Sequence, residues 1–273
     1  MSRIAGRFEQ LAAQGRTALI PYIVAGDPVL EITVPLMHAL VEQGADIIEL
    51  GVPFSDPMSE GPVIQLGHER ALANGTSLRD VVALVREFRR RDMQTPVLLM
   101  GYANPVEHMG YAAFADAASD AGVDALLTVD IPPEEVAGIN AELQRVGMDN
   151  ILLISPTTPD ERIAQIVQRA SGFIYYVALK GVTGAGHLDT EDVSRHLARI
   201  RAHSRLPVAV GFGIKDAASA ATLAPMADGV VVGSALIKCM AETLDAGGDH
   251  GAVMDAATAL LAGIRQGIDG AAS

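Results

Sequence analysis

Short runs of apolar residues recur along the chain, separated by longer stretches in which apolar residues return every three to four positions. The short runs are nearly continuous rather than alternating, which is typical of parallel strands buried on both faces. They predict strands at 18–24, 47–51, 97–102, 125–129, 151–154, 173–178, 208–211 and 230–232. The amphipathic stretches between them predict helices over 34–43, 78–89, 112–121, 133–146, 161–170, 191–201 and 217–223.

Eight strands that alternate with helices over roughly 250 residues indicate a (β/α)8 TIM barrel. An open doubly wound sheet is the alternative. The turn after the first strand reads Ala25-Gly26-Asp27-Pro28, however, and lacks the glycine fingerprint of dinucleotide-binding sheets. Extra N- and C-terminal helices are expected at 3–14 and 252–265. No linker or low-complexity segment divides the chain, so residues 1–273 are expected to form a single barrel domain.

Composition narrows the class of protein. The 273 residues carry a formal net charge of −13, which argues against nucleic-acid binding because phosphate backbones require clustered Lys and Arg. The one basic cluster, 86–91, is interpreted as the solvated end of a helix. No run approaches the ~20 apolar residues of a membrane helix, and the N-terminus lacks the apolar core of a signal peptide, so a cytoplasmic location is expected. The lone Cys239 and the spacing of the histidines indicate no metal site.

The second predicted strand carries an acid where a strand has no structural use for one. Glu49 is flanked by Ile48 and Leu50, and an ionised carboxylate in an apolar setting is costly unless it is paired or protonated. Burial raises a carboxyl pKa toward neutrality, which suits proton transfer. The alternative is that Glu49 points outward to the helices or pairs with a cation. Glu60 follows in a loop bounded by prolines, where an ordinary surface acid is the alternative.

Other acids lie beside prolines at strand ends. Asp27, Asp56 and Asp130 each occupy such a position, and each could simply form a turn.

Glycine-rich turns end the last two predicted strands. They read Gly211-Phe212-Gly213 and Gly233-Ser234, and bare N–H groups at such turns bind phosphate in barrels of this kind. The segment 181–186 could add a further N–H group. The alternative is that these glycines only permit tight turns.

Taken together, these motifs resemble the tryptophan synthase α subunit family over residues 1 to 265. The block from Glu49 to Pro57, Glu-Leu-Gly-Val-Pro-Phe-Ser-Asp-Pro, is the most specific part of the match. The other matching segments are 21–28, 61–65, 181–184 and 211–214.

The resemblance implies a retro-aldol cleavage of indole-3-glycerol phosphate to indole and glyceraldehyde 3-phosphate. Glu49 would be the main acid and base, and Glu60 would stabilise positive charge at the indole nitrogen. Thr183 would meet Glu60 when the sixth loop closes and excludes water. The resemblance implies further ligand contacts: phosphate on Gly184, Gly213, Gly233 and Ser234, and the ring among Tyr22, Met100, Leu127, Tyr175 and Phe212.

The resemblance also implies a partner. A β subunit that holds pyridoxal phosphate would receive the indole, in a heterotetramer of two α and two β chains that contact one another around Asp56 and Pro57. No cofactor is expected on this chain itself. The family usually has Asp at position 60, where this chain has Glu, one methylene longer.

Three alternative functions remain open. They are a free-standing lyase of the same fold, a mainly regulatory partner of the β enzyme, and a different phosphate-sugar barrel enzyme such as an isomerase.

Overall fold

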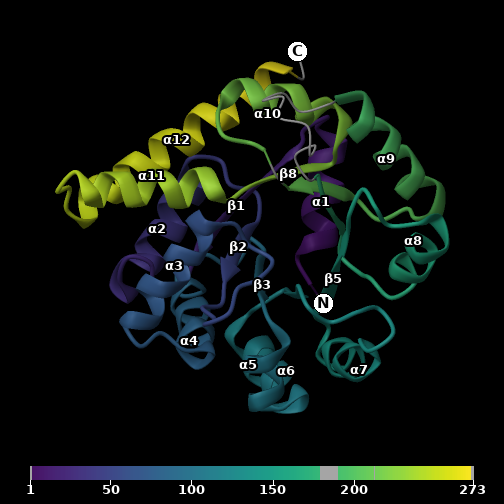
Figure 1. Ribbon diagram of the computed structural model, residues 1–273, viewed down its shortest axis with the longest axis horizontal. Helices are drawn as coiled ribbons and strands as arrows, with labels where there is room; N and C mark the ends of the chain where they lie inside the picture. Colours follow the sequence, from purple (N-terminus) through teal and green to yellow (C-terminus); the bar gives the residue numbers. More distant parts are fainter. Residues whose placement is uncertain (1, 179–189, 212, 272–273) are drawn as a thin grey trace.

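The strands form a closed parallel barrel. The computed structural model describes residues 2–178, 190–211 and 213–271, and within them strands β1 to β8 pair in chain order until β8 returns to β1 (Figure 1). The strands are β1 (Ala18–Val24), β2 (Ile48–Gly51), β3 (Val97–Gly101), β4 (Ala125–Thr128), β5 (Asp149–Ile154), β6 (Ile174–Val177), β7 (Val208–Gly211) and β8 (Gly229–Val232). The predicted TIM barrel is therefore confirmed.

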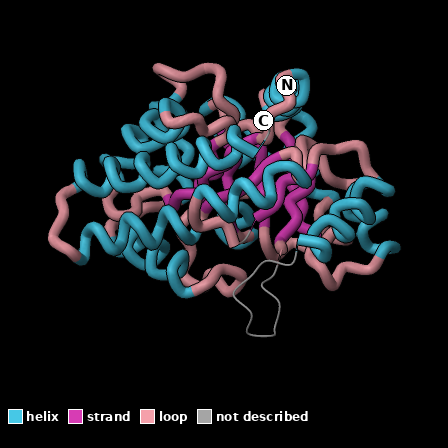
Figure 2. Tube along the Cα trace, turned by 90° about the horizontal axis from the view of Figure 1, so that it is seen from above, coloured by secondary structure: helices cyan, strands magenta, loops and turns pink. Residues whose placement is uncertain are grey.

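Helices surround the barrel on all sides, and Figure 2 shows the strands enclosed by them. They are α1 (Ile4–Ala13), α2 (Leu30–Glu42), α3 (Pro62–Ala73), α4 (Leu78–Phe88), α5 (Ala103–Met109), α6 (Tyr111–Ala121), α7 (Ala137–Val146), α8 (Asp160–Val167), α9 (Thr190–His203), α10 (Ala217–Leu223), α11 (Ser234–Asp245) and α12 (His250–Ala271), with a 3-10 turn η1 (Ala224–Met226). None of the helices in the described ranges is long and apolar enough to cross a membrane.

Side chains alternate along each strand between the barrel interior and the helix layer. On β1, Tyr22 belongs to the interior cluster and Ile23 to the outer one. Tyr22 pairs in register with Glu49 of β2, which in turn pairs with Leu98 of β3. Because paired residues of parallel strands point to the same face, Glu49 points into the barrel and not toward the helices.

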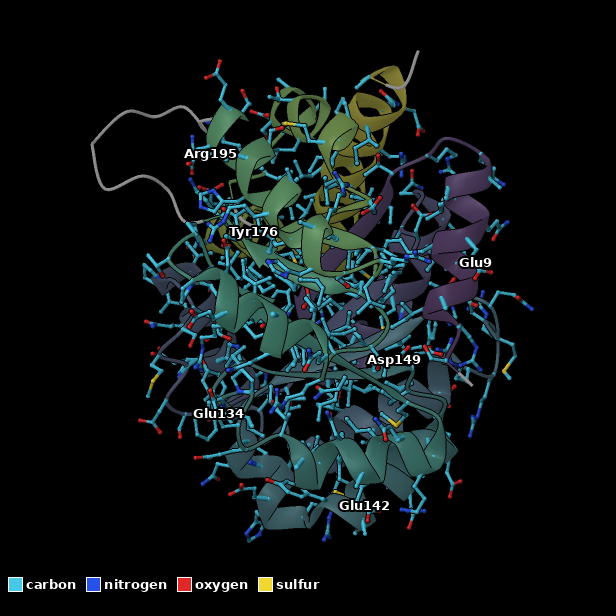
Figure 3. All side chains as sticks on the ribbon, turned by 90° about the vertical axis from the view of Figure 1, so that its right-hand side faces the viewer. Glu9, Glu134, Glu142, Asp149, Tyr176 and Arg195 are labelled. Atoms are coloured by element: carbon cyan, nitrogen blue, oxygen red, sulfur yellow. The ribbon has the colours of Figure 1, made fainter. Side chains whose placement is uncertain are left out.

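Helix α1 closes the amino end of the barrel. Ile4, Phe8 and Leu11 are buried with the interior residues, and the Phe8 ring lies 5.6 Å from the ring of Phe173, just before β6. Figure 3 shows Glu9 of α1 on the same side as Asp149, which begins β5. Chemistry in such a barrel lies at the opposite, carboxyl end of the strands.

Three aspartates tie neighbouring strands together at the amino end. Each precedes a strand and accepts an N–H group from the strand before it: Asp46 from Leu19 at 3.0 Å, Asp124 from Val97 at 2.9 Å, and Asp228 from Val208 at 2.8 Å. Each also pairs with an arginine.

The interpretation of 86–91 as a solvated helix end is wrong for Arg89. Its side chain is buried, donates to the carbonyl of Thr95 at 2.6 Å, and pairs with buried Asp124 at 2.9 Å. Arg90 and Arg91 are exposed, as expected. Tertiary contact with Asp124, 35 residues later, decides which arginine is buried.

Three helices lie outside the predicted ones: α3, α5 and α11. Pro62 occupies the first turn of α3, a preferred helix-starting position, although the sequence pattern predicts only a loop bounded by prolines there. The first turn of α5 is held by a distant residue, because Asp130 accepts the N–H of Ala103 at 2.8 Å.

Candidate active site

Glu49 lies in the barrel interior near the carboxyl end of β2. Its side chain is 0 % exposed, and neither carboxyl oxygen has a hydrogen-bond partner among the described residues. Burial raises the pKa of Glu49 to about 8, and the negative charge of Glu60 adds to the increase. A carboxyl group in this setting is protonated at neutral pH and can both give and take a proton.

Glu60 approaches from the β2–α3 loop. It is buried, and its carboxylate accepts a hydrogen bond from the Tyr102 hydroxyl. Burial raises the pKa of Glu60, the Tyr102 bond acts to lower it, and the charge of Asp130 acts to raise it. The Tyr102 hydroxyl therefore stabilises the charged form of Glu60, whereas Glu49 has no such donor among the described residues.

Tyr102 is held on two sides at the end of β3. Its hydroxyl oxygen accepts the N–H of Ser59 at 3.0 Å, and its ring stacks on Phe54 with centroids 4.9 Å apart. Burial and the contact with Glu60 raise the pKa of Tyr102 well above its ordinary value, so it remains a donor. These contacts fix the position of Glu60 through its loop.

Four of the five predicted ring-enclosing residues are described, and they lie in or against the cluster inside the barrel. Tyr22 and Leu127 belong to the interior cluster, and Met100 and Tyr175 pack against it. A β-carbon added at Gly51 would overlap the Tyr22 hydroxyl, and one added at Gly211 would overlap the Tyr175 hydroxyl. The side chain of each tyrosine thus packs over a glycine of the next strand, close to Glu49 and Glu60.

The glycine turns lie at the carboxyl ends of β7 and β8. Gly213 has a φ of +83° and is exposed, while Gly233 precedes the first residue of α11, the exposed Ser234. The first N–H groups of a helix have no intrahelical acceptor, so they are available to an anion. Backbone dipoles at such turns can bind an anion without a lysine.

Some predicted residues fall outside the described ones. These are Thr183, Gly184 and Phe212, together with the rest of the 179–189 segment.

The acids beside prolines have separate roles. Asp56 is exposed next to half-buried Pro57, with its carboxylate accepting the Ser55 hydroxyl at 2.6 Å. Asp27 is buried and makes a two-fold contact with Arg70, at 2.6 Å and 2.9 Å. Asp27 therefore ties the end of β1 to α3.

Tyr102 and His68 are site residues that the sequence patterns did not single out. Tyr102 is the last residue of the strand predicted at 97–102, and an aromatic hydroxyl at the active end of a barrel strand is a usable signal. His68 lies on α3, which was not predicted, and its contacts with Tyr22 and Phe54 join separate elements.

Two further observations concern metal binding and a separate cavity. The described residues contain no group of three or more His, Cys, Asp or Glu arranged to hold a metal ion. A cavity of about 530 Å³ opens at the amino end, beside Phe8, Arg16 and Ile268, and its described lining includes none of the candidate residues.

Comparison with known proteins gives one consistent result. A family model described as tryptophan synthase alpha chain matches residues 8–261. The tryptophan synthase alpha chain of Nitrosococcus oceani is 61 % identical over 238 residues, which cover 87 % of this chain and 88 % of that one. That of Thiobacillus denitrificans is 56 % identical over 271 residues, covering 99 % and 97 %.

Solved structures agree with these relatives. Tryptophan synthase subunit alpha from Legionella pneumophila superposes with a TM-score of 0.91 at 47 % identity, and the match covers 99 % of each chain. Tryptophan synthase from M. tuberculosis in its aminoacrylate-bound form gives 0.86 at 35 % identity, covering 98 % of this chain and 100 % of that one.

Proposed function

The chain belongs to the family of tryptophan synthase alpha chains, lyases that cleave indole-3-glycerol phosphate, and we propose that Glu49 and Glu60 carry the charge and proton movements of that cleavage. The observation that carries this proposal is the environment of Glu49. It is an interior carboxyl with no described hydrogen-bond partner and a pKa of about 8, beside a second acid held by Tyr102.

In the proposed sequence of steps, Glu49 gives up one proton and takes one back. The protonated carboxyl gives its proton to C3 of the indole ring, and positive charge develops at the ring nitrogen, which the Glu60 carboxylate stabilises. The Glu49 carboxylate then takes the proton of the glycerol hydroxyl next to the ring. The electron pair of that O–H bond forms the aldehyde, and the C–C bond breaks, returning its electrons to the ring. Indole and glyceraldehyde 3-phosphate leave, and Glu49 is again protonated.

The phosphate is proposed to lie on the turns at Gly213, Gly233 and Ser234. The exposed N-terminus of α11 supports this placement, since its dipole favours an anion. The ring would then reach the acids among Tyr22, Met100, Leu127 and Tyr175. Thr183, Gly184 and Phe212 keep the roles implied by the family resemblance.

Replacing Glu49 tests the main assignment. Glu49→Gln keeps the size of the side chain but cannot exchange a proton, so we expect indole formation to fall by about 10²- to 10⁴-fold. The measurement is steady-state release of indole from indole-3-glycerol phosphate. Glu9→Gln, an exposed acid on α1 at the other end of the barrel, is the matched control and should keep full activity. Near-normal release by Glu49→Gln would remove Glu49 from the mechanism.

Two substitutions test the role of Glu60, one that shortens the side chain and one that removes its carboxylate. Glu60→Asp keeps the carboxylate and should retain activity, whereas Glu60→Ala removes the stabilising charge and should cost about 10²- to 10³-fold in kcat. The same indole assay applies, with thermal unfolding to verify that both variants fold. A fully active Glu60→Ala enzyme would contradict the role of Glu60.

Solved tryptophan synthase structures among the matches suggest association with the beta subunit. In this family pyridoxal phosphate belongs to the beta chain, so none is assigned here. We propose two alpha and two beta chains, with Asp56 and Pro57 in the contact. Their exposed loop supports this, as does Met58, which is 79 % exposed beside them. The cytoplasmic location and the single domain over 1–273 stay predictions.

Adding a beta subunit separates the alternatives. A heterotetramer by light scattering, together with indole formation by the isolated alpha chain, would support the proposal. A chain that stays alone would indicate a free-standing lyase. A chain that forms no indole and only activates its partner would indicate a regulatory subunit.

A further inference from the structure

A chain of hydrogen bonds joins the loop after β2 to the side chain of Tyr22. The N–H of Phe54 lies 3.0 Å from Nδ1 of His68, and Nε2 of the same ring lies 3.2 Å from the Tyr22 hydroxyl oxygen. Both side chains are buried, with 1 % of His68 and 3 % of Tyr22 exposed. These contacts link β1, the loop and α3 at the mouth of the barrel.

The backbone donor determines the direction of every bond in this chain. Because the Phe54 N–H can only donate, Nδ1 of His68 must be the bare, accepting nitrogen. Burial lowers the pKa of His68 to about 4, so the ring is neutral and carries its single proton on Nε2. Nε2–H therefore donates to the oxygen of Tyr22. The hydroxyl proton of Tyr22 is left free to point elsewhere.

Tyr22 lies alongside the path that the substrate must follow. At one end of the side chain, a β-carbon added at Gly233 would lie 3.3 Å from the Tyr22 β-carbon, so Tyr22 begins beside the proposed phosphate turn. At the other end, its hydroxyl lies over Gly51, two residues beyond its register partner Glu49. In the proposed function the three-carbon chain of the substrate connects the same two places, because the phosphate is placed at one and the reacting carbon at the other.

We propose that the Tyr22 hydroxyl donates a hydrogen bond to a hydroxyl oxygen on the three-carbon chain of the substrate, and that His68 is the positioning residue that aims this donor. The inference rests on the proposed function of the site. It assigns to Tyr22 a selectivity for hydroxylated over deoxygenated chains. A buried donor that meets no acceptor is unfavourable, so a ligand without these hydroxyls gains nothing from Tyr22.

The test compares two ligands that differ only in the proposed acceptor. Indole-3-propanol phosphate keeps the ring, the three carbons and the phosphate of the substrate and lacks the two hydroxyls. Tyr22→Phe keeps the ring and loses the donor. We expect kcat/KM for indole-3-glycerol phosphate to fall about 3- to 10-fold, while the inhibition constant of indole-3-propanol phosphate stays unchanged or falls, because Tyr22→Phe removes a donor that this ligand leaves unpaired.

Two variants of His68 separate positioning from packing. Asn at position 68 can still accept from the Phe54 N–H but does not reach Tyr22, so His68→Asn should reproduce the selective loss. Gln places an amide N–H near the former Nε2, so His68→Gln should retain most of the selectivity. Adding His68→Asn to Tyr22→Phe should cost nothing further, since both remove the same interaction.

Different results would overturn the role of Tyr22 and the proposed function on which it rests. Equal changes for both ligands, or no change for either, would overturn the role of Tyr22. So would a shift in the pH profile of kcat in Tyr22→Phe, which would indicate that Tyr22 donates to Glu49. If the parent enzyme formed no indole from indole-3-glycerol phosphate, the proposed function itself would fail.

Discussion

At the scale of single residues, two carboxyl groups eleven positions apart are both buried, which raises the pKa of each, but only one of them has a described hydrogen-bond donor. Glu49 is surrounded by interior side chains and has no described donor, which favours its neutral form. Glu60 accepts from Tyr102, which favours its charged form. The difference suits one group to transfer a proton and the other to stabilise a cation.

The raised pKa of Glu49 also makes stability depend on pH. The pKa is about 8 in the folded chain against an ordinary 4.5, so between these values the folded state holds a proton that the unfolded state has lost. Stability therefore falls as pH rises through this window, by up to about 1.4 kcal/mol per pH unit, and levels off above pH 8. Glu49→Gln removes this effect.

We expect Glu49→Gln to gain stability over the parent progressively from pH 5 to pH 8. The measurement is the free energy of unfolding in urea at several pH values. Glu9→Gln on the exposed face of α1 should show no such trend. A difference between Glu49→Gln and the parent that is constant with pH would mean that Glu49 is already ionised when folded.

At the scale of elements, two pairs of neighbouring strands show the same packing arrangement, a tyrosine of one strand over a glycine of the next. Tyr22 of β1 extends over Gly51 of β2, and Tyr175 of β6 extends over Gly211 of β7. A glycine at the end of each second strand makes room for the aromatic side chain of the first. Conformational freedom is not the reason here, because neither glycine has a positive φ. The reason is the absence of a β-carbon.

Gly211→Ala should therefore disturb both the packing and the site. The added methyl overlaps Tyr175, so the ring must move, and we expect a destabilisation of about 1–3 kcal/mol with a raised KM. Thermal unfolding and indole kinetics measure the two effects. Gly6→Ala is the matched control, since its new β-carbon would have no neighbour within 4 Å. Equal behaviour of the two variants would contradict the packing argument.

At the scale of the whole molecule, the two ends of the barrel serve different purposes. The candidate residues lie at the carboxyl ends of the strands. The amino end carries α1 and the buried ion pairs of Asp46 with Arg265 and of Asp124 with Arg89. Substitutions at the amino end should change stability and leave the chemistry intact.

Asp124→Asn tests this separation. It leaves the buried guanidinium of Arg89 without its counter-ion, which should cost about 3–5 kcal/mol in the free energy of unfolding. The kcat/KM of the folded variant should match the parent at a temperature below its transition. Asp116→Asn breaks an exposed pair with Arg145 and should cost no more than about 1 kcal/mol. A loss of activity in folded Asp124→Asn would show that the two ends are coupled.

The sequence by itself determined the barrel and singled out Glu49 as a carboxyl group with no structural use in its strand. Parallel strands buried on both faces appear as continuous apolar runs, so β1 and β7 were predicted with their observed bounds. Glu49 was recognisable because a carboxyl group in such a run is out of place. The glycine turns after the last two strands could also be predicted, because the glycines of each turn are close together in the sequence.

Only the tertiary structure decided which groups contact these residues. Tyr102 reaches Glu60 across 42 positions, His68 reaches Tyr22 across 46, and Arg89 meets Asp124 across 35. Such contacts depend on which face of each strand turns inward and on how α3 packs over the mouth. A pattern of apolar and polar positions records the period of an element but not its neighbours in space, so these partners emerge only when the barrel closes.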